Sequence, residues 1–483
     1  MRVCPLPTPP CRKPARIFLP LIFSLLFFCA VFSARAGVPL FSTIVTNGPV
    51  TNRINLVLLA EGYTTSQLGQ FLIDATNAAN AFLSVEPYAE YAGYFNVFAI
   101  ATNSANSGST HLNSRGYAAG YTYFNSSYDS LYDLYITIPP NSVDANNADG
   151  QGKIDALLQK YLPGTNNDLP ALLVNDVVEG GSDNYGSTAI ACVGAKLGAI
   201  LVHESGHTLG KLGDEYTTEY PGYTSVEKPN CTANTNYSTL KWNAWVSPNT
   251  PIPTPPYTTY ESVVGVFQGA NYHTNGWYRP YYNCCMESIL YAASFCPVCT
   301  EALVLAIYGK DRPIDSLAPA TNNLTNASAK MLTFSLNLLQ PATHSLNVQW
   351  LTNKVAVAGA TNPIFNIWPA QLGNGTQKVE ADVWDATPMV RTDPNSQLKQ
   401  TNVWTLVQTV PTLKINQAKW LTNGSFALQV TGAAPDGVLI QFSTNLVQWT
   451  SLLTNYFTNG IINYTNSGAK TNPRDFYRVE TPP

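Results

Sequence analysis

The sequence predicts an α/β (α+β) domain followed by two small all-β, sandwich-like modules. Three observations support this prediction. Continuous apolar runs alternate with helical stripes over roughly the first 270 residues, the pattern of a buried sheet covered by helices. One apolar helix in this region carries His-Glu-Ser-Gly-His at residues 203–207. After Asp311 the helical stripes end, and short alternating runs separated by turn residues replace them.

The elements of the first domain follow from these runs. Strands are expected at residues 54–60, 95–101, 132–138 and 170–175, and helices at 66–82, 152–162 and 193–209. Ser66 can cap the first helix. Gly210 follows the last helix and permits a sharp turn at its end. We expect residues 37–310 to form this domain, with an N-terminal part up to about residue 130 and a catalytic part from there to residue 310.

Residues 1–36 have the composition of a secretory signal sequence. Basic residues from Arg2 to Arg16 precede an apolar run at residues 17–32, and Ala34-Arg35-Ala36 supplies a small-residue cleavage site. An uncleaved anchor is the alternative, but this run is short for a membrane span. We therefore expect a secreted or extracytoplasmic protein whose mature part, from Gly37, has no transmembrane segment.

The charge balance argues against a nucleic-acid partner. Removal of residues 1–36 leaves 21 of the 26 Lys and Arg against 30 Asp and Glu, so the formal net charge falls from −4 to about −9. Nucleic-acid binding needs a basic surface. Charged residues make up only 12% of the chain, which fits a neutral polar surface of an exported protein.

Six cysteines follow the signal sequence. They are Cys192, Cys231, Cys284, Cys285, Cys296 and Cys299. An even number in an oxidising compartment favours disulfides, whose pairing the sequence cannot fix. The alternative is a structural zinc ion held by Cys284 or Cys285 together with Cys296 and Cys299. Export makes disulfides the favoured prediction.

The motif at residues 203–207 predicts a zinc site. His203 and His207 are four residues apart, so on a helix both imidazoles lie on one face and can bind one metal ion. Glu204 lies beside them, where its carboxylate can accept a proton from water. Two histidines that are merely packed or solvated are the alternative. We favour Zn²⁺ as the cofactor.

A third ligand must come from beyond Gly210. Zinc peptidases with an extended motif place it three residues after the glycine, but Gly213 stands there and cannot bind a metal. Asp214 is the first candidate and Glu215 the second. Alternatively, both carboxylates only cap or solvate a turn. Three protein ligands would leave open the fourth position that a catalytic zinc needs.

Several motifs in the right order resemble the M64 metallopeptidases, a family that includes immunoglobulin A peptidases. The central match is HESGHTLGKLGDEY at residues 203–216. Further matches occur at residues 58–64, 86–88, 94–97, 276–280, 285–286 and 295–299. The resemblance therefore covers residues 40–308.

This resemblance implies a zinc-dependent endopeptidase with a zincin- or metzincin-like core that acts on proteins or peptides. It implies His203, His207 and Asp214 as zinc ligands and Glu204 as the general base. Met286 would lie in the turn beneath the metal, although ordinary core packing is the alternative.

The sequence departs from some metzincins in one respect. They carry a tyrosine two residues after the methionine of the turn, where Ser288 stands here. A donor to the transition state is therefore expected elsewhere, at Tyr278, Arg279 or His273.

The two predicted β-modules show no visible chemistry. The first spans residues 311–410, with alternating runs at 332–336 and 346–350. The second spans residues 411–483 and resembles C-terminal β-modules of exported bacterial proteins. Contact with a cell surface or a glycan is one role open to them.

Two hypotheses on function follow. The favoured one is a secreted zinc endopeptidase, because His203, Glu204, His207 and Asp214 are all intact. The second is a catalytically inactive surface protein that binds glycan or protein through its β-modules.

Overall fold

The computed structural model describes most of the chain from Leu40 onward. The described ranges are 40–111, 122–129, 133–139, 150–165, 168–184, 186–220, 222–289, 294–327, 330–409, 413–432, 437–457, 460–469 and 474–480. The predicted signal sequence lies outside them, so its cleavage stays a prediction. Among the described helices, none combines the length and the apolar character needed to cross a bilayer.

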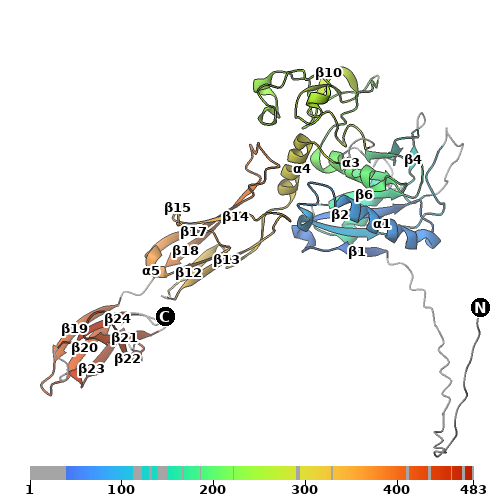
Figure 1. Cartoon of the computed structure of the whole chain (residues 1–483). Coiled ribbons are helices and arrows are strands. Elements are labelled where there is room, and N and C mark those ends of the chain that lie inside the picture. Colours follow the sequence, from blue (N-terminus) through green and yellow to red (C-terminus); the bar gives the residue numbers. More distant parts are fainter. Residues whose placement is uncertain are drawn as a thin grey trace, which may run out of the picture. The chain divides into compact units, whose positions relative to one another are not determined.

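A six-stranded sheet forms the centre of the first domain (Figure 1). Its strands, in spatial order, are β1 (Phe41–Val45), β3 (Phe95–Ile100), β2 (Ile54–Glu61), β6 (Asp168–Val174), β8 (Thr188–Cys192) and β7 (Gly181–Asn184). The four inner strands are parallel, and β1 and β7 run antiparallel at the two edges. Every residue of β2 is buried, which explains its continuous apolar sequence. Strands β1, β2 and β3 come from the predicted N-terminal part, up to about residue 130, and β6, β7 and β8 come from the predicted catalytic part. Both parts therefore contribute strands to one sheet.

The helices of this domain lie close to the predicted positions. They are α1 (Leu68–Phe82), α2 (Gly150–Tyr161), α3 (Leu197–Gly210) and α4 (Pro297–Lys310). Helix α3 packs on β8 and contacts both α1 and α4. Ser66 is not the cap of α1, because it lies inside a 3-10 turn, Thr65–Gln67. The Thr64 amide donates to the Gln67 side chain at 2.9 Å, so the helical region begins at Thr64.

The long segment between α3 and α4 contains little regular structure in its described part. Its elements are the strands β9 (Phe267–Ala270) and β10 (His273–Arg279) and the 3-10 turns η4 (Tyr237–Thr239), η5 (Asn243–Trp245) and η6 (Thr258–Tyr260). A further short pair, β4 (Ser127–Tyr128) with β5 (Ile136–Thr137), precedes α2. Trp242 is buried and donates to the Gly265 carbonyl at 2.9 Å. Side-chain anchors of this kind therefore hold the segment in place.

Two all-β regions follow α4, as the alternating pattern predicts. The first has the sheets β11-β13-β16 and β12-β18-β17-β14-β15, and the second has β19-β20-β23 and β22-β21-β24. The strands of the first are β11 (Ile314–Ala318), β12 (Asn323–Asn326), β13 (Leu332–Leu338), β14 (Asn347–Thr352), β15 (Val355–Ala356), β16 (Ile364–Ile367), β17 (Gly375–Trp384) and β18 (Lys399–Gln408), with the short helix α5 (Pro369–Leu372). Those of the second are β19 (Lys414–Trp420), β20 (Phe426–Thr431), β21 (Val438–Ser443), β22 (Thr450–Asn455), β23 (Ile461–Asn466) and β24 (Phe476–Glu480).

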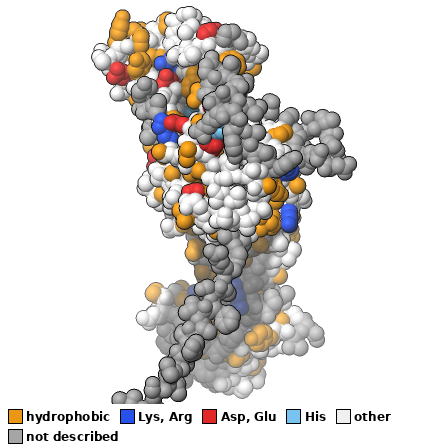
Figure 2. All heavy atoms as spheres, turned by 90° about the vertical axis from the view of Figure 1, so that its right-hand side faces the viewer, with side chains coloured by type: hydrophobic (Ala, Val, Ile, Leu, Met, Phe, Trp, Pro, Cys, Tyr) orange, Lys and Arg blue, Asp and Glu red, His pale blue; other side chains and the backbone are white. Residues whose placement is uncertain are grey.

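Each all-β region has its own apolar core. Trp350 and Trp404 stack at 5.7 Å between ring centroids in the first, and Val430 and Ile440 lie in the core of the second. On the face seen in Figure 2, acidic and basic side chains are few and scattered. This agrees with a charged fraction of 12%.

A buried cluster of hydrogen bonds joins the first domain to the first all-β region. Asp385 accepts from the hydroxyls of Tyr91 and Tyr308, both at 2.7 Å. His344 reaches Asp385 through Nε2 at 2.7 Å and Glu90 through Nδ1 at 2.8 Å. Because both carboxylates are buried, His344 is the cation that compensates them.

We expect His344→Ala to destabilise the protein by on the order of 2 kcal/mol, because two buried carboxylates lose a charged donor. Burial alone would lower the pKa of His344, but Asp385 and Glu90 outweigh it and raise that pKa. A raised histidine pKa contributes stability that is present below about pH 6.5 and lost as pH rises through the folded-state pKa. Thermal denaturation of both proteins at pH 5.5 and pH 9 measures this difference.

The control is His273→Ala, since the partner of His273 is the exposed Glu219 and the effect should be smaller. An equal cost of His344→Ala at both pH values would contradict the ionic character of the contact.

Candidate metal centre

Helix α3 is buried over most of its length, including its polar residues. His203, Glu204 and Ser205 are buried together with Leu201 and Leu209. The helix begins at Leu197 instead of the predicted Val193, because residues 193–196 form bends and turns. A helix with polar groups in the core requires partners from other segments. Those partners define the site.

The end of α3 differs from the prediction. Gly210 stays helical, and Lys211 takes the left-handed conformation with φ 53°. The reason for a glycine at position 210 is close packing: a Cβ there would lie 2.8 Å from Leu303 Cδ2 of α4. The Lys211 amide closes the helix by donating to the His207 carbonyl at 3.1 Å.

His203, His207 and Asp214 meet at one point. His203 Nε2 lies 3.2 Å from His207 Nε2 and 3.2 Å from Asp214 Oδ1, and His207 Nε2 lies 3.3 Å from the same oxygen. The Nδ1 atom of His203 faces the Cys285 carbonyl at 2.8 Å, and that of His207 faces the Leu212 carbonyl at 2.9 Å. Each Nδ1 therefore donates its proton to a carbonyl, which leaves both Nε2 lone pairs free toward the shared point.

These residues fit a zinc ion. Two Nε2 atoms without protons cannot hydrogen-bond to each other, and a shared cation between them would be compatible with their approach to 3.2 Å. Zinc bonds of about 2.0–2.1 Å to nitrogen and oxygen give tetrahedral edges of about 3.3 Å, close to all three separations. Asp214 Oδ1 lies closer to His207 Nε2, at 3.3 Å, than Glu204 Oε2, at 4.0 Å.

Glu204 lies beside this point and is buried. Burial raises the pKa of Glu204 to about 8, opposed chiefly by His203. The backbone of β7 runs close to it: a Cβ at Gly181 would lie 2.8 Å from Glu204 Oε1. The Gly181 amide is itself paired, because it donates to the Leu134 carbonyl at 3.1 Å.

The electrostatics of the site centre on Asp214. Burial alone would raise the pKa of Asp214, but His207 and His203 hold it well below its ordinary value. The same contacts raise the pKa of both histidines, although burial lowers it. An ionised carboxylate beside two imidazoles is the charge pattern of a site for a divalent cation.

Two tyrosines that the sequence analysis did not single out lie at the site. Tyr272 donates to Asp214 Oδ2 at 2.7 Å, and the Tyr216 hydroxyl lies 3.5 Å from His203 Nε2. Burial raises the pKa of both hydroxyls far above the ordinary value, so both stay protonated donors. Tyr272 stands in a turn with φ 61°, and no spacing in the sequence links it to the motif.

The contacts of the predicted donors involve other residues, and a role for them in the transition state stays a prediction. The Tyr278 backbone pairs with Thr232, and Arg279 donates to the carbonyls of Gln268 and Gly269. His273 contacts Glu219 and Ser225.

Met286 packs beneath the motif. It is fully buried, and a Cβ at Gly206 would lie 2.9 Å from its sulfur. The Met286 carbonyl accepts from the Glu215 amide at 2.8 Å, which joins the loop around Met286 to the segment after α3. This placement agrees with a methionine turn, whose role stays a prediction.

Glu215 turns away from the histidines. Its Oε1 accepts from Asn230 at 2.9 Å and from the Cys299 thiol at 3.3 Å. Burial raises the pKa of Glu215 well above its ordinary value, and the neighbouring Cys284 adds to this shift. Glu215 is therefore not placed to be the third ligand beside His203 and His207.

The predicted disulfides are absent. All six cysteines after residue 36 are buried free thiols. The sulfur atoms of Cys284 and Cys299 lie 3.8 Å apart, against about 2.05 Å in a disulfide. Three of the six instead gather around Glu215.

Comparison with known proteins identifies the family. The model of the family "IgA Peptidase M64" matches residues 43–261 and 256–307, more than half of the chain. The chain belongs to the IgA peptidase M64 family, a family of metallopeptidases, as its motifs indicate. Membership of this family supports the assignment of the chain as a peptidase, which is a hydrolase, and implies that it uses a metal ion. No curated protein matches the chain.

Similar solved structures include a β-glucuronidase 3 of Bacteroides uniformis, with 10% identity over 38% of this chain and a TM-score of 0.14. The match spans only 25% of the length of that enzyme. Fibronectin(III)-like modules of CbhA from Clostridium thermocellum match at 12% identity over 31% of this chain and 76% of theirs, with a TM-score of 0.15. Scores this low carry no argument about fold or function.

We expect Gly206→Ala to destabilise the protein by about 1–3 kcal/mol, because the new methyl group overlaps the Met286 sulfur. Gly69→Ala in α1 is the matched control: nothing lies within 4 Å of a Cβ there, and alanine favours the helix by up to about 1 kcal/mol. Urea denaturation of both variants measures the difference. Equal stability would show that Gly206 is not packed tightly on Met286.

Tyr272→Phe removes the hydroxyl that orients Asp214 and leaves the ring in place. Loss of such a supporting hydrogen bond typically weakens metal affinity by about 10–100-fold. Competition for zinc with a chromogenic chelator measures the change. Tyr237→Phe, at an exposed tyrosine of η4, is the control. Unchanged zinc affinity in Tyr272→Phe would show that the Tyr272 hydroxyl does not support metal binding.

Proposed function

We propose that the chain is a secreted zinc-dependent endopeptidase with His203, His207 and Asp214 as ligands and Glu204 as general base. The observation that carries this proposal is the meeting of two Nε2 atoms and one carboxylate oxygen at mutual separations of 3.2–3.3 Å. Membership of the M64 family supports it.

The residues divide the work of peptide hydrolysis. Zinc, when bound, supplies a Lewis acid that activates water and polarises the scissile carbonyl. The Glu204 carboxylate accepts a proton from the attacking water and returns it to the leaving amine. Burial raises the pKa of Glu204 to about 8, and a divalent cation bound beside it would lower that pKa and favour the carboxylate that accepts the proton. Tyr216, a neutral donor near His203, is the candidate to stabilise the developing oxyanion.

The substrate of this proposal is a protein or peptide. Export through residues 1–36 would place the enzyme outside the cytoplasm. Contact of the β-modules with a glycan or cell surface stays a prediction. An inactive binding protein is the second candidate, and the assay below separates the two.

Glu204→Gln should reduce cleavage of an unfolded protein and of a mixed peptide library by about 10²–10⁴-fold, because it removes the base. Zinc content should stay the same, since Glu204 is not a ligand. Glu179→Gln, at an exposed carboxylate paired with Lys196, should leave cleavage unchanged. A zinc chelator should abolish cleavage in the parent protein.

Two outcomes would overturn the proposal. Full activity in Glu204→Gln would exclude Glu204 as the base. A zinc-loaded parent protein that cleaves no bond in either substrate would favour the inactive binding protein.

A further inference from the structure

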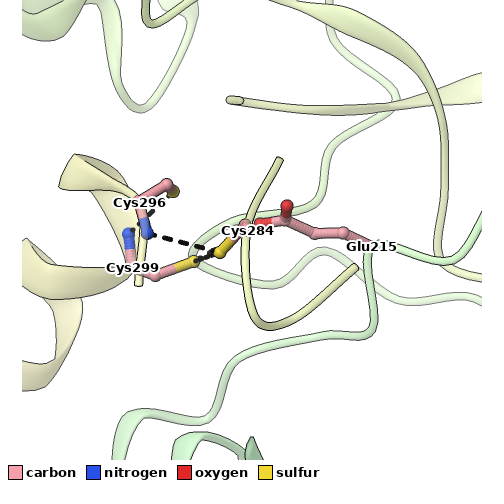
Figure 3. Close-up of side chains that lie close together, drawn as sticks. All are labelled: Glu215, Cys284, Cys296 and Cys299. Atoms are coloured by element: carbon pink, nitrogen blue, oxygen red, sulfur yellow. Dashed lines mark hydrogen bonds between the residues drawn. The ribbon is translucent and has the colours of Figure 1, made fainter. Parts of the chain in front are cut away.

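A second group of metal-binding side chains lies apart from the histidines. We call it the thiol–carboxylate cluster, and its members are Glu215, Cys284, Cys296 and Cys299. Glu215 comes from the segment after α3, Cys284 from the loop after β10, and the other two from the start of α4. Figure 3 shows Glu215 and Cys284 directed toward the end of α4 that carries Cys296 and Cys299.

The separations within the cluster fit one tetrahedral ion. Zinc–sulfur bonds of about 2.3 Å give a tetrahedral edge of about 3.8 Å between two sulfurs. Cys284 Sγ and Cys299 Sγ lie 3.8 Å apart, and Cys299 Sγ lies 3.3 Å from Glu215 Oε1. One ligand atom from each of the four residues lies within 4.8 Å of all the others.

The cluster is buried and leaves one of its carboxylate oxygens without a hydrogen-bond partner. All four side chains are buried, and Glu215 Oε2 has no hydrogen-bond partner among the described residues. Buried carboxylate oxygens in proteins are otherwise paired. A cation at the centre of the cluster supplies the missing partner and compensates the charge of the ligands.

The backbone around the cluster is arranged for thiolates. The Cys296 amide points at Cys284 Sγ at 3.3 Å, and the Cys299 amide points at Cys296 Sγ at 3.5 Å. Cys296 is also the N-cap of the 14-residue helix α4. Amide donors and the positive end of a helix both stabilise negative sulfur.

We propose that Glu215, Cys284, Cys296 and Cys299 bind a second metal ion, zinc by its preference for thiolates, in a closed structural site. Four protein ligands leave no open position, so the site has no catalytic role. Soft thiolate ligands favour zinc over magnesium or calcium, which prefer oxygen.

The thiol–carboxylate cluster is connected to the histidine site through two loops. Glu215 follows Asp214 directly, and its amide donates to the Met286 carbonyl. Cys284 precedes Cys285, whose carbonyl orients His203 at 2.8 Å. One ion in the cluster would therefore fix both loops that hold the histidine site in place.

Metal content measured by mass spectrometry tests the proposal. The zinc-supplemented parent protein should hold two zinc ions per chain, and His207→Ala and Cys299→Ser should hold one each. Cys285→Ala is the matched control, because this buried thiol neighbours the cluster without belonging to it, and it should keep two. Parent protein with one zinc, lost only in His207→Ala, would overturn the inference.

Two measurements on the parent protein do not depend on the folding of a variant. Cobalt substitution should give the intense near-ultraviolet band of thiolate ligation, and chelator should expose Cys284, Cys296 and Cys299 to alkylation. A disulfide between any two of these three cysteines in peptide mapping would overturn the proposal, as would a cobalt derivative without that band.

The metal measurements and the peptidase assay can fail independently of each other. An inactive protein with two zinc ions would refute the peptidase and support the cluster. An active protein whose only zinc is lost in His207→Ala would refute the cluster and support the peptidase.

Discussion

The structure depends most on one requirement: the polar groups of α3 need partners inside the protein. His203 and Glu204 lie in the core, where an unpaired polar group is costly. The partners of His203 and His207 come from chain segments after the helix, through the carbonyls of Leu212 and Cys285 and the carboxylate of Asp214. The long segment between α3 and α4 therefore folds back over the helix, although its described part has few strands and helices of its own.

The separation of Asp214 from Glu215 follows from the local backbone. Asp214 Oδ1 lies 3.2 Å from His203 Nε2, whereas Glu215 Oε1 lies 3.3 Å from the Cys299 sulfur, so the two neighbouring carboxylates have different partners. Asp214 thus faces the histidines and Glu215 faces the thiols. Asn230 fixes this arrangement, because it bonds the amide and the carbonyl of Gly213 at 2.7 and 2.8 Å and Glu215 at 2.9 Å.

The extra residue before Asp214 also has a structural reason. A Cβ at Gly213 would lie 2.9 Å from Lys228 Cγ and 3.1 Å from Cys231 Sγ, so only glycine fits beside the loop that carries Asn230. The chain therefore uses the usual ligand position for close packing and supplies a carboxylate one residue later.

Local sequence patterns were sufficient to predict those elements whose formation depends on local periodicity. The apolar run of β2, the stripe of α1 and the i, i+4 histidines of α3 each follow from periodicity, and the structure has all three elements. The end of α3 was not predictable, because the glycine at position 210 is required by close packing against Leu303, almost a hundred residues further along the chain. Tyr272 was missed for the same reason, since its contact with Asp214 spans 58 residues of irregular chain.

The cysteines show a different limit. Export favours disulfides in general, but pairing depends on which sulfur atoms the fold brings within bonding distance. Here three thiols converge on a buried carboxylate, and a fourth, Cys285, lies next to them in sequence without joining them. The number and spacing of cysteines are the same in both interpretations, so composition could not decide between them.

A metal ion in the thiol–carboxylate cluster would also give the irregular segment its stability. Few backbone ladders cross the described part of residues 211–296, so little regular hydrogen bonding opposes the entropy of the open chain. A metal cross-link between Glu215, Cys284 and α4 closes loops of this chain and reduces that entropy. Metal binding then competes with oxidation for the same sulfur atoms, because a bound thiolate is not free to attack a disulfide. On this proposal, early metal capture both folds the segment and keeps the three thiols of the cluster from pairing, and the histidine site forms on the scaffold that results.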